Sequence, residues 1–200
     1  LEDQVGVGLE PAVIASWNRW FEAHPDLIFQ GFTAADLDKA HRTRRTAIFF
    51  GAQNPSCIED DIGLVEVLHR LGLRFMQLTY NNQSLLASGC YEADDTGLTR
   101  MGRAVVAEMN RVGMLVDVSH CTERTCFDAI EYSSRPIAVT HANPQEFVGK
   151  DIELNRRNKS TELIRKLAAS GTTVIHLVRD ARTDRAGRPD DRGRRGALPG

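Results

Sequence analysis

The stretch from Gly97 to Pro144 constrains the fold most, because it holds two short apolar runs that each stop at a histidine. The runs are residues 114–118 and 137–139, and the histidines are His120 and His141. An amphipathic segment of helical length separates them. Two parallel strands joined by a helix bring the residues at their carboxyl ends to one edge of a sheet. The stretch therefore predicts a strand, helix and strand unit that presents two imidazoles, which are ligands that zinc favours.

The same alternation extends over most of the chain. Further apolar runs, each expected to be a strand, occupy residues 47–50, 73–78 and 172–178. Segments with helical spacing of apolar residues lie at 11–24, 33–41, 59–71, 99–111 and 160–169. Strands that are apolar throughout and alternate with helices indicate a parallel α/β fold. A closed eightfold barrel usually needs about 250 residues, so about five β/α units predict an incomplete TIM-barrel-like fold or an open sheet.

The end of the chain differs in composition from the rest. Residues 179–200 are rich in Arg, Gly and Asp and contain no aromatic residue. A disordered tail is the expected structure for such a composition. Two other interpretations stay open, a nucleic-acid-binding arm and an ending read in another frame, although the aspartates argue against a purely basic arm. The predicted organisation is one partial barrel domain at 1–178 and a tail at 179–200.

Charge and hydropathy exclude some classes of partner. The formal net charge is −2, which favours neither nucleic acid nor an anionic membrane as a partner. The four cysteines have neither CxxC spacing nor the density of a disulfide-stapled domain. No run approaches the roughly 18 apolar residues of a membrane span, and the first residues lack a signal-peptide profile. These features favour a soluble chain that is cytoplasmic rather than secreted.

Polar side chains follow four of the expected strands and are the candidate site residues. They are Gln53, Tyr80, His120 and His141, and strand alternation places them at one mouth of the fold. A single histidine is more often a structural residue bonded to a backbone carbonyl, but two at equivalent strand ends favour a metal site. Asp117 is either a hydrogen-bonding partner of a ligand or a satisfied strand-end carboxylate.

Two weaker candidates lie outside the strand ends. Arg157 follows a long polar loop and is either a clamp for a carboxylate or part of a solvated basic turn. His24, Pro25 and Asp26 have the H-x-D spacing of a metal motif. They lie between two expected helices, so a turn is the simpler interpretation.

Several motifs in one order resemble the membrane (renal-type) dipeptidase family of zinc peptidases. The motifs are IFFGAQN at 48–54, LGLRFMQLTYNN at 71–82, GLTRMGRAVVAEMNRVGMLVDVSH at 97–120, SSRPIAVTHANP at 133–144 and NRRN at 155–158. The resemblance covers roughly residues 34–178.

The resemblance implies a (β/α)8 metallo-hydrolase barrel with two zinc ions that hydrolyses dipeptides. It places the two later zinc-binding histidines of the family on His120 and His141. It places the bridging glutamate on Gln53, a substrate-contacting histidine on Tyr80 and the arginine for the substrate carboxylate on Arg157. The expected cofactor is zinc and the expected partner a dipeptide, with a homodimer as a further expectation.

The departures from the family pattern bear on activity. The family's first H-x-D pair has no counterpart upstream of Gln53, and the late barrel strands with their aspartate are expected to be missing. Gln53 is neutral, so it lacks the charge that bridges two dications. The sequence therefore predicts a zinc-dependent dipeptidase by descent, with impaired activity in this chain. The alternative is a non-catalytic fragment or pseudoenzyme that binds small peptides or a partner.

Overall fold

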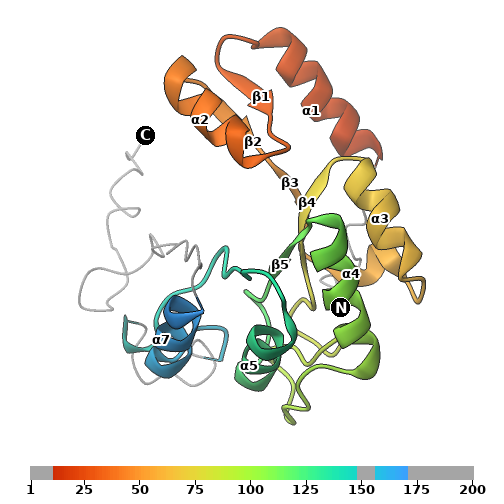
Figure 1. Ribbon diagram of the computed structural model, residues 1–200, viewed down its shortest axis with the longest axis vertical. Coiled ribbons are helices and arrows are strands. Elements are labelled where there is room, and N and C mark those ends of the chain that lie inside the picture. Colours follow the sequence, from red (N-terminus) through yellow and green to blue (C-terminus); the bar gives the residue numbers. More distant parts are fainter. Residues whose placement is uncertain (1–10, 148–155, 171–200) are drawn as a thin grey trace, which may run out of the picture.

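The computed structural model describes residues 11–147 and 156–170 (Figure 1). The expected strand at 172–178 and the tail at 179–200 lie outside the described residues. The helices and strands, in chain order, are α1 (Pro11–Ala23), β1 (Ile28–Gln30), α2 (Ala34–Thr43), β2 (Thr46–Ile48), β3 (Phe50–Ala52), η1 (Pro55–Ile58), α3 (Gly63–Arg70), β4 (Leu73–Gln77), α4 (Arg100–Val112), β5 (Leu115–Asp117), α5 (Glu123–Tyr132), η2 (Gln145–Phe147) and α7 (Thr161–Ala169).

All strand pairs within the described residues are parallel, which confirms the α/β class. β1 pairs with β2 in one sheet, and β3, β4 and β5 form a second sheet in that order. In Figure 1, α1 and α2 flank the first sheet, and α3 and α4 lie side by side along the second. No closed barrel is present in the part of the chain that the structure describes.

Three expectations about strands need correction. The run at 47–50 is divided between β2 and β3, which belong to different sheets. The run at 137–139 forms bridges in place of a strand: Ala138 pairs in parallel with Asp117, and Ala138 N donates to Val116 O at 2.8 Å. β1 was not predicted, because its three residues, Ile28–Gln30, are too short to show a periodic pattern.

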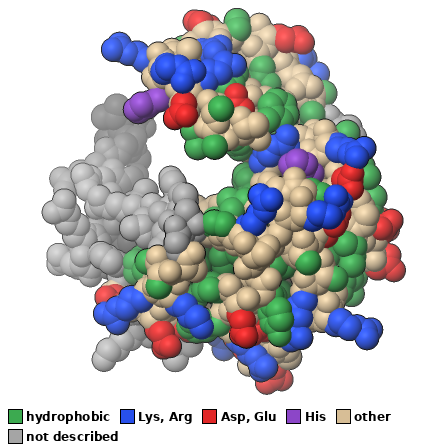
Figure 2. Space-filling view, viewed as in Figure 1, with side chains coloured by type: hydrophobic (Ala, Val, Ile, Leu, Met, Phe, Trp, Pro, Cys, Tyr) green, Lys and Arg blue, Asp and Glu red, His purple; other side chains and the backbone are tan. Residues whose placement is uncertain are grey.

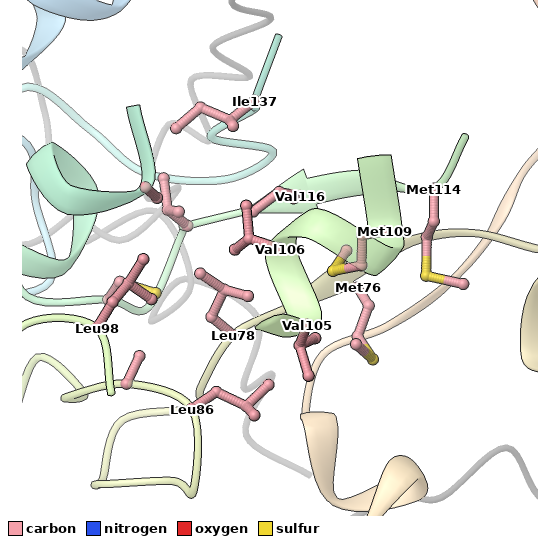
Figure 3. Packing of buried hydrophobic residues seen from close by; sticks show 14 of the residues in the cluster. Met76, Leu78, Leu86, Leu98, Val105, Val106, Met109, Met114, Val116 and Ile137 are labelled. Atoms are coloured by element: carbon pink, nitrogen blue, oxygen red, sulfur yellow. The ribbon is translucent and has the colours of Figure 1, made fainter. Parts of the chain in front are cut away.

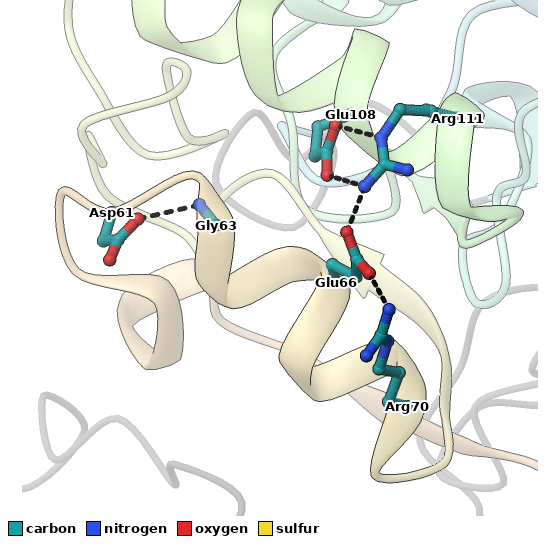
Figure 4. A network of polar contacts seen from close by, with 6 residues as sticks. All are labelled: Asp61, Gly63, Glu66, Arg70, Glu108 and Arg111. Atoms are coloured by element: carbon teal, nitrogen blue, oxygen red, sulfur yellow. Dashed lines mark hydrogen bonds and ion pairs between the residues drawn. The ribbon is translucent and has the colours of Figure 1, made fainter.

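The helices follow their capping residues closely. α2 begins after Thr33, whose backbone N donates to the Asp36 side chain at 2.9 Å, as the predicted capping box requires. α4 ends at Gly113, which has φ +85°. The helix expected from residue 59 instead begins at Gly63, because Asp61 Oδ1 accepts from Gly63 N at 2.8 Å and starts the helix there (Figure 4).

The main core lies between α4 and the second sheet. Figure 3 shows Val106 and Met109 of α4 beside Met76 of β4 and Val116 of β5, and all four are at most 1% exposed. Met76 and Val116 are register partners, so they share the sheet face that α4 covers. Burial of such side chains stabilises the fold by roughly 1.5–3 kcal/mol each.

Ion pairs join α3 and α4 on the outside of this core (Figure 4). Arg111 Nε donates to Glu108 Oε2 at 2.8 Å, and Glu66 pairs with both Arg111 and Arg70. Elsewhere on the surface, Figure 2 shows basic and acidic side chains intermixed over the described part of the visible face. None of the described helices is long and apolar enough to cross a membrane.

Candidate functional site

His120 and His141 meet beyond the carboxyl end of β5. His120 follows β5 by three residues, and His141 follows the bridge at Ala138 by the same number. Their Nε2 atoms are 2.9 Å apart. Tyr80, which follows β4, stacks on His120 with ring centroids 4.3 Å apart, and Gln53 Nε2 lies 3.3 Å from His141 Nε2. The side chains after four chain segments therefore gather at one edge of the second sheet.

Asn81 fixes the tautomer of His120. Asn81 Oδ1 lies 2.7 Å from His120 Nδ1 and also accepts from the Cys90 thiol at 3.6 Å, which is consistent with an oxygen at that position. His120 Nδ1 therefore carries the proton, and Nε2 presents a lone pair. His120 is 2% exposed. Its backbone O accepts from Cys90 N at 2.9 Å, so hydrogen bonds hold both its ring and its backbone.

Thr140 and Asp117 fix His141 in the same way. The Thr140 hydroxyl donates to Asp117 Oδ2 at 2.6 Å, and its oxygen lies 2.8 Å from His141 Nδ1. Because the hydroxyl proton is engaged with Asp117, His141 Nδ1 donates and Nε2 presents its lone pair. Ser119 donates to Asp117 Oδ1 from its backbone N at 2.9 Å and from its hydroxyl at 2.5 Å. Asp117 is thus a satisfied carboxylate that also acts on a site histidine.

Burial keeps His120 neutral. Desolvation is the largest cause that lowers its pKa, to about 3, followed by the charge of Arg157 and then by His141 and Lys159. Two neutral imidazoles with lone pairs aimed at each other repel, and a cation between them removes that repulsion. A neutral imidazole is the form of histidine that can act as a metal ligand.

Close backbone packing holds Asn81 against the His120 turn. Gly89 forms a bridge with Cys121, and a Cβ at position 89 would lie 2.1 Å from the Asn81 carbonyl oxygen. Only glycine allows this approach. Asn81 itself has φ +62°, a conformation that asparagine tolerates better than most residues.

A cluster of cations lies beside the histidines. Lys159 is 3% exposed and donates to the Cys121 carbonyl at 2.9 Å. Arg157 is half-buried, and its Nε is buried without a hydrogen-bond partner among the described residues. The charges of both residues act on His120. An orphaned guanidinium nitrogen can donate a charge-assisted hydrogen bond to a carboxylate.

A cavity of about 340 Å³ adjoins the histidines through Tyr80. Residues after β3 and β4 line it, among them Asn54, Glu59, Asn82 and Gln83. Its lining combines amide and hydroxyl groups with the apolar side chains of Pro55, Leu85 and Leu86.

The donor set fits one metal ion better than two. Two ligand nitrogens on a tetrahedral zinc ion are roughly 3.3 Å apart, close to the 2.9 Å between the two Nε2 atoms. Gln53 supplies a neutral amide, and its nitrogen faces His141. Within residues 11–147 and 156–170, no group of three or more His, Cys, Asp or Glu is placed to hold a metal.

The sequence named the four residues that meet here and also Asp117, but it missed Asn81 and Thr140. Asn81 and Thr140 each follow or precede a named residue, and only the three-dimensional contacts reveal their roles. Asn81 has a positive φ, and asparagine is enriched in that conformation. The residue type at position 81 is therefore the one local feature of the sequence that agrees with this turn. His24 and Asp26 are exposed between α1 and β1 and do not join the site.

Several known proteins are similar to this chain in sequence or in structure. The chain is 31% identical over 132 residues to the dipeptidase tcpJ of Claviceps purpurea, which covers 65% of this chain and 31% of that protein. It is 36% identical to an amidohydrolase of Pseudomonas aeruginosa, with a TM-score of 0.73 over 82% of this chain and 48% of that one.

A third relative shares the fold. It is a metallo peptidase of Rhodobacter sphaeroides, solved with a phosphinate mimic of the dipeptide L-Ala-D-Ala, with 22% identity, a TM-score of 0.74 and coverage of 88% of this chain and 51% of that one. The chain thus spans about half the length of these solved structures and about a third of the dipeptidase.

The family comparison covers nearly the whole described chain. The profile described as "Membrane dipeptidase (Peptidase family M19)" matches residues 3–179, which include both histidines, Tyr80 and Arg157. With the parallel fold and the paired imidazoles, this match shows that the chain belongs to the membrane dipeptidase family, peptidase family M19.

Proposed function

We propose that this chain carries part of the site of a zinc-dependent dipeptidase, with His120 and His141 as ligands to one zinc ion. The observation that carries the proposal is the approach of the two Nε2 atoms, 2.9 Å apart, each with its Nδ1 proton held by a separate acceptor. Zinc is the metal that imidazole pairs commonly bind in hydrolases. The dipeptidase activity of the relatives is a proposal for this chain, because the relatives are about twice as long or longer.

The residues around the histidines have separate roles in this proposal. Arg157 binds the terminal carboxylate of a dipeptide through its guanidinium group. Lys159 adds positive charge beside it while holding the turn after His120 through the Cys121 carbonyl. Tyr80 covers one face of the His120 ring and excludes water from it. A bound metal would supply an activated water and polarise the scissile carbonyl.

Gln53 favours a second candidate function, a site that binds dipeptides without cleaving them. Its amide nitrogen faces His141, where a carboxylate would be needed to bridge two metals. A ligand role for Gln53 needs its Oε1 turned toward the metal. The non-catalytic alternative predicts weak zinc binding and no turnover.

Zinc content and hydrolysis of L-Ala-L-Ala distinguish the two candidates. Stoichiometric zinc with turnover is expected for the wild-type protein, and His120→Ala or His141→Ala should each lose most bound zinc because a direct ligand is removed. The control is His41→Ala, an exposed histidine on α2. Equal zinc in the site variants and the wild type would contradict the ligand assignment, and weak zinc binding without turnover supports the binding function.

Association into a homodimer remains a prediction. Light scattering at several protein concentrations would test it.

A further inference from the structure

We propose that the cavity beside Tyr80 receives the N-terminal residue of the dipeptide, and that Glu59 selects a cationic side chain there. This inference rests on the proposed function and deepens it by naming a substrate class. It is carried by the place of the cavity, by its charge and by the backbone of Glu59.

The cavity and the histidine pair are connected through Tyr80. Tyr80 stacks on His120 and also lines the cavity, and Asn54, another lining residue, follows Gln53. The cavity is therefore one side chain, that of Tyr80, away from His120. Its volume of about 340 Å³ exceeds that of any single amino-acid side chain, so a long one fits with water.

The surroundings of the histidine pair and the lining of the cavity differ in charge. The positive charges of Arg157 and Lys159 act on His120, and neither residue lines the cavity. Glu59 is the one charged residue among those that line the cavity, and the rest of the lining is neutral. A dipeptide with its carboxylate at Arg157 and its peptide bond at the histidines directs its first residue away from these cations. The cavity is the hollow available to that residue.

Glu59 is held in a costly backbone conformation. Its φ is +48° and its ψ is −119°, outside the regions that residues other than glycine usually adopt. The η1 turn enforces it: Glu59 N donates to Ser56 O at 3.1 Å, and Asn54 Oδ1 accepts from Ser56 N at 3.0 Å. Such strain is typical of functional positions, where it fixes the direction of a side chain.

The carboxylate of Glu59 is available for a ligand. It makes no hydrogen bond or ion pair with the described residues, unlike Glu66 and Glu108 on the outer helices. An ammonium or guanidinium group in the cavity would gain a charge-assisted hydrogen bond from it. Glu59 is exposed, and such a bond at an exposed site gives a preference of up to about fivefold over a neutral group of the same shape.

Paired substrates that differ only in charge test this inference. L-Arg-L-Ala is compared with L-citrullyl-L-Ala, because citrulline has nearly the shape of arginine without its charge. The wild-type protein loaded with zinc should prefer the arginine dipeptide up to about fivefold in kcat/KM. Glu59→Gln should bring the ratio close to one, and Asp60→Asn, the loss of a neighbouring exposed carboxylate outside the cavity lining, should preserve it.

A second variant and a binding measurement keep the test decisive. Glu59→Gly removes the carboxylate and suits the positive φ, so it should fold as well as the wild type and also lose the preference. If neither dipeptide is hydrolysed, the proposed function fails, and calorimetry with the same two dipeptides still measures the ratio of dissociation constants. A wild-type ratio near one, or a ratio retained in both Glu59 variants, overturns the inference in either measurement.

Discussion

At the scale of single residues, the partners of the two histidines matter as much as the histidines. A free imidazole can place its proton on either nitrogen, and only one tautomer presents Nε2 to a metal. Asn81 selects that tautomer for His120, and Thr140 with Asp117 selects it for His141. Partners of this kind typically contribute 10- to 100-fold in metal affinity.

Replacing Asn81 tests this role. Asn81→Gly removes the acceptor of the Nδ1 proton and tolerates the φ of +62°, so backbone strain is not added. Zinc affinity, measured by competition with a fluorescent chelator, should fall about 10- to 100-fold. Asn81→Asp keeps an acceptor at the same place and should retain zinc affinity. Unchanged affinity in the glycine variant would remove Asn81 from the site.

The sequence predicted which residues form the site better than it predicted their contacts. Strand ends in a parallel fold converge by geometry, so Gln53, Tyr80, His120 and His141 were placed together from the chain order alone. The contact of Asn81 with His120 depends on Gly89 packing against the Asn81 carbonyl. That contact joins segments from a long polar loop with no periodic pattern, so nothing local in the sequence encodes it. The metal-ligand roles of His120 and His141 stay predictions, as do the roles of Tyr80, Arg157 and Gln53.

At the scale of elements, helices were predicted better than strands. Thr33 and Gly113 mark helix ends through hydrogen bonding and φ, which are local properties of the chain. Strand pairing is not local: four successive apolar residues at 47–50 cannot show that Ile48 pairs with β1 and Phe50 with β4. The division of that run between two sheets is therefore a tertiary result.

The ion pairs between α3 and α4 make a small contribution to stability that depends on pH. The side chain of Arg111 is the main cause that lowers the pKa of Glu66 below 4.5 in the folded protein. A carboxylate with a lowered pKa stabilises the folded state above its unfolded pKa, and this effect is lost as the pH falls through the folded value.

Glu66→Gln should therefore lower Tm slightly at pH 7, and the difference from the wild type should disappear near pH 3. High salt should also reduce the difference at pH 7, because the pair is exposed. Thermal unfolding followed by circular dichroism measures both. Glu131→Gln on α5, a carboxylate with no ion pair among the described residues, is the control. A Tm difference that persists at pH 3 contradicts the assignment.

At the scale of the whole molecule, the two sheets differ greatly in burial. Between residues 12 and 50, Gly31 alone is buried, whereas most of β4 and β5 lies in the main core. The first sheet and its helices contact the rest through aromatic packing, with Phe21 stacked on Phe50 at 6.1 Å and Trp17 beside both rings. Local stability follows buried contacts, so the first sheet should open more readily.

Hydrogen exchange measures that difference. Amides of β1 and β2 should exchange at least about tenfold faster than those of β4 and β5 after correction for intrinsic rates, because they open without disrupting the main core. Mass spectrometry of peptides that cover residues 27–48, 73–77 and 115–117 gives the comparison. Equal protection in both sheets would show that they unfold as one unit.

The order of strands in the second sheet has a consequence for how the protein is made. β3, β4 and β5 are neighbours in space in the order in which they leave the ribosome. Each strand can pair with one that already exists, and each helix then covers the new pair. Parallel pairing across long connections is slow for a free chain, but stepwise addition during synthesis avoids competition from strands not yet made. His120 and His141 come together only after Ala138 has paired with Asp117 of β5, so the site forms after all three strands of this sheet have been made.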